Sequence, residues 1–268
     1  MTFGLTEEQV LVRDTFARYV DDKLLPAAEA IDEAHEYPRE YIDQLAELGF
    51  IGMRYPENVG GSDAGLLTFC LAIEQVARGS MSVAGAIAMQ ALMGTKFLHM
   101  LGNDDIKERL FKPALEGKKL GGICMTEPNA GSDLGGISTN ATKVDGGYKI
   151  NGAKTWVTAA PVADFFTVFA KAGEEQKLTI FLVEKDFEGL IIGKPIEKMG
   201  VRSLPTSEVT FDDCFVPDSH RLSTEEGDAE GHLRKLLSEI RIMTAALGLR
   251  VAQAALDESI KYAEERKQ

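Results

Sequence analysis

The chain has 268 residues, of which 44% are hydrophobic and 26% are charged, a composition typical of folded soluble proteins. It excludes a collagen, an intrinsically disordered tail and a small disulfide scaffold. Lysine and arginine number 29 against 42 acidic residues, so the net charge is −13 and neither nucleic acid nor an anionic membrane is expected as a partner. Any anionic ligand must therefore be held by local groups.

The termini and the cysteines restrict the location of the protein. The longest charge-free stretch, residues 79–95, falls short of the roughly 18 strongly apolar residues that a membrane span needs, and it predicts a buried helix. Glu7 and Glu8 stand where a signal or transit sequence would be apolar or basic, so we expect a cytoplasmic protein, or a processed protein of the mitochondrial matrix. The cysteines lack CxxC spacing and predict buried free thiols rather than a disulfide or a metal site: Cys70, Cys124 and Cys214.

Residues 1–119 carry helical signals and predict an N-terminal all-α domain. Thr6 and Gln9 form a capping box at the start of the first helix. Proline and glycine are expected to close or open helices because of their backbone preferences. The first expected helix has an apolar stripe at Leu11, Phe16, Val20 and Leu24, and we expect it to end at Pro26. Four further helices are expected: from Pro38 to Gly49, from Leu66 to Arg78, over residues 79–95, and from the N-cap residue Asn103 onward.

Residues 120–222 change to short β-branched and aromatic runs, which predict an antiparallel β-barrel or sandwich. Asn151-Gly152 lies between two such runs and predicts a type I′ hairpin turn. Residues 223–268 form the third domain, with a loop at 223–231 and then helical spacing to Tyr262. The expected strands are residues 122–125, 137–142, 148–150, 155–158, 165–170, 178–183, 190–192 and 209–211.

Two segments of the middle region offer chemistry. Residues 126–133, Thr-Glu-Pro-Asn-Ala-Gly-Ser-Asp, follow an expected strand and could present N–H groups and hydroxyls to a phosphate or a polar ring edge, although such turns also occur for structural reasons. Trp156 is the only tryptophan, and Thr158 follows on the same strand face. This pair suits a planar heterocycle, and a tryptophan that fills the barrel core is the alternative. Neither a GxGxxG nor a P-loop motif is present.

In order and spacing, these segments resemble the flavin-dependent acyl-CoA dehydrogenases. The resemblance covers essentially the whole chain and is specific because several motifs occur in the family's order, although Val59 stands where an aromatic residue is usual. The segments that carry it are residues 56–61, 126–133, 151–158, 199–206, 211–217 and 241–266.

The resemblance implies an α+β multidomain fold, with an N-terminal all-α domain, a central antiparallel β-barrel or sandwich and the start of a C-terminal helical bundle. It also implies FAD-dependent α,β-dehydrogenation of an acyl-CoA thioester to a trans-2-enoyl-CoA, with electrons passed to an electron-transfer flavoprotein. In the family a carboxylate removes the α proton, and hydrogen bonds to the thioester carbonyl stabilise the enolate. A homotetramer is expected by the same resemblance.

Residue by residue, the resemblance assigns two groups of positions. Of the cofactor positions, Met125 and Thr126 match residues beside the flavin pyrimidine, and Gly131 and Ser132 match residues beside the pyrophosphate. The third group is Trp156, Val157 and Thr158, in which Trp156 lies against the flavin ring and Thr158 lies near N5. The substrate positions are Ser132, Arg241 and, one turn before it, Ser238. Arg241 could instead be an ordinary surface residue paired with an acid.

The catalytic base is not identified by the resemblance. Most family members carry it on helices that come after the segment resembling residues 262–268, so we expect this chain to be a fragment that retains flavin weakly and turns over poorly by itself. The alternatives are a short protein that relies on a partner for the base and the adenine site, and an inactive homologue. A minority place the base directly before the residue that matches Arg241, where this sequence has Ile240. Glu239 is one position earlier, about 100° away around the helix, and is a weak candidate.

Two other functions stay open. The chain could be a non-catalytic subunit that binds flavin or CoA, or an oxidase or flavin monooxygenase on the same fold. Apolar residues of the last helix would be unpaired in the isolated chain and would favour association. The length and branching of the acyl group cannot be predicted, because only part of the expected pocket is in this sequence.

Overall fold

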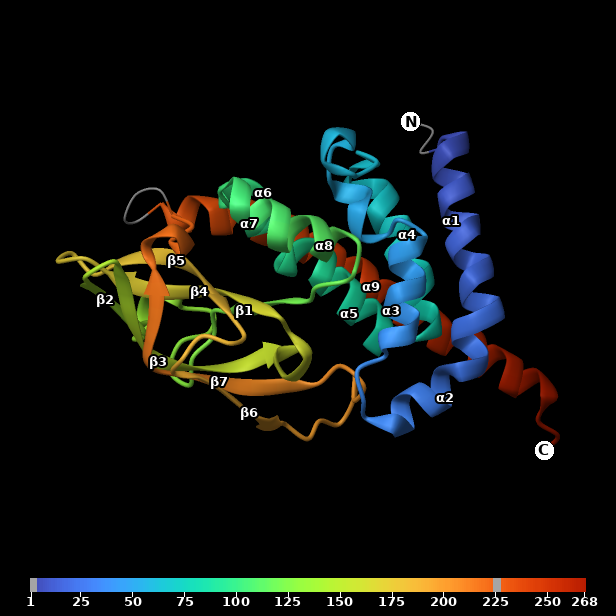
Figure 1. Ribbon diagram of the computed structural model, residues 1–268. Coiled ribbons are helices and arrows are strands. Elements are labelled where there is room, and N and C mark those ends of the chain that lie inside the picture. The colour runs from blue at the N-terminus through green and yellow to red at the C-terminus, as the bar shows by residue number, and fades with distance from the viewer. Residues whose placement is uncertain (1–3, 224–227) are drawn as a thin grey trace.

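The computed structural model describes residues 4–223 and 228–268, which form a helical part, a sheet part and a long final helix (Figure 1). This order confirms the α, β, α arrangement expected from the sequence. The helices of the first part are α1 (Glu7–Tyr19), α2 (Leu25–Ala34), α3 (Arg39–Glu47), α4 (Gly65–Gly79), α5 (Met81–Met89), α6 (Lys96–Leu101), α7 (Asp104–Ile106) and α8 (Lys112–Leu115).

The first helix begins as expected but does not end as expected. The capping box is present: Gln9 N–H donates to the Thr6 hydroxyl at 3.2 Å, and Thr6 N–H donates to the Gln9 side chain at 3.0 Å. Pro26 does not close the segment, because a π-helical turn (Val20–Leu24) leads directly into α2. Pro26 is the second residue of α2 and directly follows this π-helical turn, in which the backbone already departs from regular α-helical hydrogen bonding. Leu11, which was expected in the apolar stripe, is 63% exposed.

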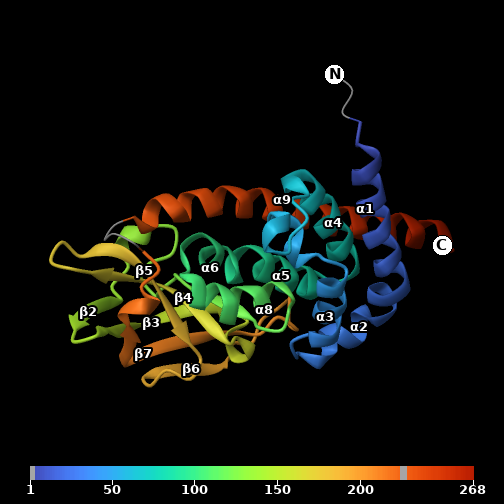
Figure 2. The ribbon, with the colours of Figure 1, turned by 45° about the horizontal axis from the view of Figure 1, so that its top comes forward.

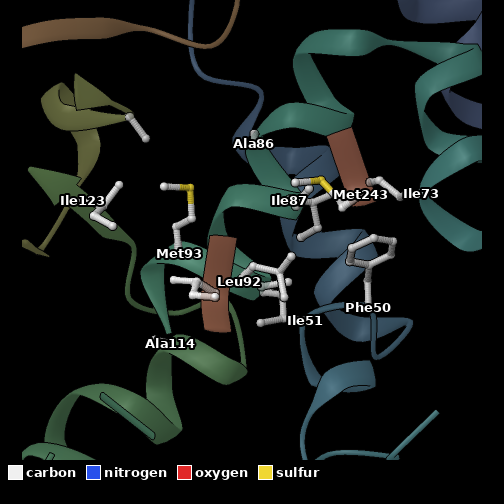
Figure 3. Packing of buried hydrophobic residues seen from close by; sticks show 14 of the residues in the cluster. Phe50, Ile51, Ile73, Ala86, Ile87, Leu92, Met93, Ala114, Ile123 and Met243 are labelled. Atoms are coloured by element: carbon white, nitrogen blue, oxygen red, sulfur yellow. The ribbon is translucent and has the colours of Figure 1, made fainter. Parts of the chain in front are cut away.

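The apolar helix expected at residues 79–95 lies in the core. The stretch Met81–Leu101 is long and apolar enough to cross a membrane by length and composition alone, but 83% of an 18-residue segment within it is buried inside the protein. Figure 3 shows how this stretch packs: Ile87 lies near Met243 of the final helix, and Met93 points toward Ile123 of the sheet part. One core therefore connects all three parts of the chain.

Seven strands of the described chain form one curled sheet. Most pairings are antiparallel, as predicted, but β4 runs parallel to both β1 and β2, so the sheet is mixed. β4 is buried along nearly its whole length because helices cover one face and the sheet interior covers the other. The strands are β1 (Gly121–Cys124), β2 (Asn140–Val144), β3 (Gly147–Thr158), β4 (Phe165–Ala172), β5 (Lys177–Glu184), β6 (Leu190–Pro195) and β7 (Thr206–Pro217).

The hairpin predicted at Asn151-Gly152 is wrong. β3 continues through both residues, and the register against β7 shifts by one residue between Ile150 and Gly152. The chain approaches β2 closely there, since a Cβ on Gly152 would lie 2.4 Å from the Thr139 hydroxyl oxygen. Glycine is therefore required by a close contact, opposite a bulge of β7 between Phe211 and Cys214. The turn between β2 and β3 instead contains Gly146, whose φ is +72°.

The last helix, α9 (Ala229–Glu265), runs beside α6, α5 and α4 and extends past α1 (Figure 2). It begins within the range expected to be a loop, part of which lies outside the described residues. Its first half buries Leu233, Leu236 and Met243 against the helical part. Its second half is largely exposed, with apolar side chains at Leu249, Val251, Leu256, Ile260 and Tyr262.

The three cysteines are free and buried, as predicted. Burial raises the pKa of the Cys124 thiol to about 12, while the nearby Lys154 ammonium lowers it. A thiol with a pKa raised in this way is a poor nucleophile at neutral pH. These residues therefore belong to the packing of the sheet and the helices.

Candidate flavin and thioester site

The two segments singled out in the sequence meet at the end of β1. Thr155 N–H donates to the Thr126 carbonyl at 2.9 Å, and the Lys154 ammonium donates to the Met125 carbonyl at 3.2 Å. Thr158 lines a small cavity together with Gly122 and Ile123 of β1. Residues about thirty positions apart in the chain are thus held side by side, as the sequence-based hypothesis requires.

Trp156 lies in a bulge of β3. The register against β7 shifts between Lys154 and Val157, so one extra residue is accommodated there. Trp156 has a φ of +57°, a backbone conformation that bulky residues rarely adopt, and it is 58% exposed. The alternative of a core tryptophan is therefore wrong. Strain of this kind persists only where the surrounding structure enforces it, and it concentrates at functional sites.

Trp156 and Thr158 share the accessible side of β3. Val157, between them, is buried in the sheet interior at 1% exposure. The hydroxyls of Thr126 and Thr158 and the indole N–H of Trp156 make no hydrogen bond to the residues that the structure describes. A flat ring and unpartnered hydroxyls thus lie on two adjoining segments, whereas Val157 contributes packing.

Behind these groups lies a buried ion pair that the sequence analysis missed. Lys154 donates to Glu127 at 2.8 Å, and their side chains are 0% and 3% exposed. Burial would raise the pKa of Glu127, but hydrogen bonds from Lys154, Thr139 and Ser138 lower it to about 2. Burial lowers the pKa of Lys154, and Glu127 opposes that shift. The one available signal was strand alternation, which places Lys154 on the same inward side as Tyr148 and Ile150.

Gly131 and Ser132 lie on an exposed loop beside a separate cleft. The loop closes through two backbone hydrogen bonds between Glu127 and Ala130, at 2.8 and 3.1 Å, so part of the expected N–H array is used internally. A cleft of about 690 Å³ opens next to Ser132, between the loop, the β4–β5 turn and the start of α9. Its lining includes three basic residues that the sequence analysis did not select: Lys171, Lys177 and Arg234.

The expected substrate residues on α9 are less clearly placed. Ser238 donates to the Lys235 carbonyl at 2.7 Å within the helix, and both Ser238 and Arg241 are exposed. Neither lines the cleft beside Ser132. Beside this cleft the structure instead brings Ser132 together with Arg234, which lies one to two helical turns before Ser238 and Arg241 on α9.

Glu239 points toward the helical part and pairs with Arg54 at 3.0 Å. The two side chains are 17% and 15% exposed, so the pair is largely shielded from water. A carboxylate that is bound to Arg54 and directed toward the helical part is a poor candidate for abstracting a proton elsewhere. Its contact with Arg54 connects α9 to the turn Ile51–Arg54.

Comparison with known proteins identifies the class. The family model for the acyl-CoA dehydrogenase N-terminal domain matches residues 6–118, and the model for the acyl-CoA dehydrogenase middle domain matches residues 122–214. The chain therefore belongs to the acyl-CoA dehydrogenase family, and the resemblance noted in the sequence is confirmed.

Individual relatives sharpen this result. The chain is 68% identical to benzylmalonyl-CoA dehydrogenase of Aromatoleum aromaticum over 268 residues, which is 100% of this chain and 71% of that protein. It is 34% identical to the caffeyl-CoA reductase-Etf complex subunit CarC of Acetobacterium woodii, covering 96% of this chain and 68% of the relative.

Solved structures agree with the fold. Butyryl-CoA dehydrogenase from Megasphaera elsdenii superposes with a TM-score of 0.92 at 34% identity, covering 100% of this chain and 72% of the other. PigA in complex with FAD gives a TM-score of 0.93 at 28% identity, covering 100% and 71%. The expected fold class is confirmed, and the family together with the PigA complex supports FAD as the cofactor.

The residues present fit this cofactor. An exposed indole supplies a flat apolar surface for a ring system, and the hydroxyls of Thr126 and Thr158 can bond to the polar edge of a ring. Met125 and Thr126 are half-buried, so groups at this position are partly shielded from water. When bound, FAD supplies the hydride-accepting chemistry that an acyl-CoA dehydrogenation needs.

Proposed function

We propose that this chain forms the flavin-binding and thioester-binding parts of an FAD-dependent acyl-CoA dehydrogenase, which oxidises an aryl-substituted acyl-CoA of the benzylmalonyl-CoA type and passes electrons to an electron-transfer flavoprotein. The observation that carries the proposal is the strained, exposed Trp156 held beside Thr126 and Thr158. The substrate class is supported by the 68% identity to benzylmalonyl-CoA dehydrogenase. The partner is supported by the relative from an Etf complex.

The cleft beside Ser132 suits the phosphate-bearing end of an acyl-CoA. Lys171, Lys177 and Arg234 bring positive charge to a chain whose net charge is −13, so an anion is attracted here by local groups. Two of these cations already have acidic neighbours: Lys177 pairs with Glu175 at 2.6 Å, and Arg234 lies 3.8 Å from Glu230. We therefore expect a moderate, salt-sensitive contribution to CoA affinity.

The acyl end would face the helical part. Thr158 shares its small cavity with Ala86, Met89 and Met93 of the core stretch, so this surface is mainly apolar. Methionine side chains are flexible and adapt to ligands of irregular shape. These residues would exclude water around the reacting carbons, which strengthens any hydrogen bond to the thioester carbonyl.

The test compares two forms of the protein: the 268-residue chain, and the same chain extended by the part of benzylmalonyl-CoA dehydrogenase that lies outside the match. Each is loaded with FAD without oxygen, and benzylmalonyl-CoA or butyryl-CoA is added. We expect the visible flavin absorbance of the extended form to bleach, faster with the aryl substrate, and that of the short form to bleach poorly. Binding of acyl-CoA without bleaching in both forms would instead support a non-catalytic subunit.

Two additions to this assay refine the proposal. Reoxidation by an electron-transfer flavoprotein, and only slowly by dioxygen, is expected for a dehydrogenase, whereas rapid reaction with dioxygen would indicate an oxidase. Glu239→Gln in the extended form should bleach at nearly the unmodified rate, because Glu239 is bound to Arg54. Complete loss of bleaching in a folded Glu239→Gln variant would identify this carboxylate as the base.

The proposal includes self-association. The second half of α9 exposes apolar residues along its length, including Leu249, Leu256 and Ile260, which is unfavourable for an isolated helix in water. We propose a homo-oligomer, with a tetramer as the family resemblance implies. Sedimentation velocity measures this directly, and a monodisperse monomer of the extended form at assay concentrations would contradict it.

A further inference from the structure

The buried Lys154–Glu127 pair is not explained by stability. Both side chains are almost completely removed from water, and transferring two charges into the interior is costly. Two apolar side chains of similar volume at such positions are often as stable or more stable than the ion pair. A retained buried pair therefore calls for another role.

Glu127 does not need Lys154 to satisfy its hydrogen-bonding capacity. Oε2 accepts from the backbone N–H and the hydroxyl of Ser138, both at 2.7 Å. Oε1 accepts from the backbone N–H and the hydroxyl of Thr139, at 3.0 and 2.6 Å. Four donors already hold the carboxylate. What only Lys154 adds is a bond from the same ammonium group to the Met125 carbonyl.

Lys154 also lies next in the chain to the residues that are proposed to bind the cofactor. It is the last residue in register with β7 before the bulge that carries Trp156. The next residue, Thr155, donates its N–H to the Thr126 carbonyl. The ammonium and this backbone bond together tie Met125 and Thr126 to the strand on which Trp156 lies. The Lys154 side chain does so from the buried side, so it leaves the exposed side open.

We propose that Lys154 is a positioning residue for the flavin cofactor, which fixes the Met125–Thr126 segment against the Trp156 bulge through its bond to the Met125 carbonyl. Glu127 holds the ammonium group in place for this purpose, and Ser138 and Thr139 hold Glu127. The inference rests on the proposed function, because it concerns the surface that would bind FAD.

The experiment replaces Lys154 by methionine, which keeps the length of the side chain and removes its donor. Glu127 retains four donors in this variant, so we expect it to fold. Affinity for FAD is measured by quenching of the single tryptophan, Trp156, and stability by thermal unfolding without FAD. We expect FAD binding to weaken about tenfold or more, the range for a lost bond to a charged group. Trp156 should also show lower fluorescence anisotropy before any FAD is added.

Two matched variants separate positioning from general stability. Thr139→Val removes one donor to Glu127 but leaves the bond from Lys154 to Met125, so it should lower the unfolding temperature and keep FAD affinity within about twofold. Lys149 lies on β3, like Lys154, and Lys149→Met removes its exposed pair with Asp213 of β7, so it should change neither property.

Each outcome decides a different point. If the unmodified chain and its extended form bind no FAD, the proposed function fails. If they bind FAD and a folded Lys154→Met variant binds it equally well, with unchanged anisotropy, the positioning role is overturned. If Lys154→Met does not fold, Thr139→Val carries the test: retained affinity despite lower stability supports the role, and affinity lost in step with stability overturns it.

Discussion

The two bulges in the pairing of β3 with β7 differ in what they accommodate. The first is in β7, and opposite it the β3 backbone at Gly152 lies close to Thr139, where glycine is the residue that fits both the φ of +151° and the space. At Trp156 the bulge places one of the largest side chains in a strained backbone conformation and leaves it exposed. The first bulge is explained by packing alone. The second has a conformational cost that packing does not explain, and this difference is why we propose it as the functional one.

The packing bulge should be the more sensitive to added volume. Gly152→Ala puts a Cβ within 2.4 to 2.8 Å of three Thr139 atoms, so we expect a loss of about 3 kcal/mol in the free energy of unfolding. Gly146→Ala is the matched control, since Gly146 also has positive φ but no atom near its Cβ position. It should lose about 1 kcal/mol, from backbone strain alone. Equal losses in denaturant unfolding would show that the contact with Thr139 is unimportant.

Acid should lower the free energy of unfolding, because Glu127, which lies behind the Trp156 bulge, becomes protonated. The pKa of Glu127 is lowered to about 2 in the folded state, so its contribution to stability is complete above the unfolded value of about 4.5 and is lost as the pH falls toward 2. We expect a loss of about 3 kcal/mol over this range from this group. Denaturant unfolding at several pH values measures it.

Thr139→Val is the control for this acid effect. It removes a hydrogen bond that lowers the Glu127 pKa, so the loss of stability over the same pH range should be smaller than in the unmodified protein. An identical pH dependence in both proteins would assign the acid loss to other carboxylates.

Removing the indole should separate binding from folding. In Trp156→Gly the strained φ becomes acceptable, and this gain of about 1 kcal/mol is offset by the greater freedom of glycine in the unfolded chain. We therefore expect little change in unfolding temperature, but about tenfold weaker FAD retention in ultrafiltration, from the loss of a flat contact surface. A large loss of stability would show that the indole serves packing, like Gly152.

The smallest effect is expected at the exposed end of β3. Lys149 pairs with Asp213 at 3.1 Å, with side chains 45% and 63% exposed. Lys149→Met should change the free energy of unfolding by less than about 0.5 kcal/mol. A larger loss in denaturant unfolding would show that the exposed end of β3 contributes more to stability than its exposure indicates.

The sequence predicted the elements of this fold better than their connections. Each expected strand segment overlaps an observed strand, because β-branched and aromatic runs between turn residues specify strands locally, but residues 148–150 and 155–158 belong to one strand, β3. Asn151-Gly152 misled the prediction, because the glycine that favours a turn also fits a strand position where another segment approaches closely, here opposite a bulge of β7. The parallel pairing of β4 was not predictable from local patterns, since it depends on contacts between distant segments.

The site was predicted in part, for a related reason. Thr126, Trp156 and Thr158 were selected by type and resemblance, and the structure brings their segments together. Glu127 and Lys154 were missed, because a charged residue in a polar turn or on a short strand is normally expected at the surface. Only the fold shows that their charges compensate each other in the interior.

The flavin site is tested most directly by titrating the unmodified chain with FAD while the emission of Trp156 is followed. Because Trp156 is the only tryptophan, its emission reports on one position. We expect saturable quenching by FAD and none by ADP, which lacks the isoalloxazine ring. Retention of FAD in ultrafiltration with unchanged Trp156 emission would show that the flavin binds elsewhere and would contradict the assignment of this site.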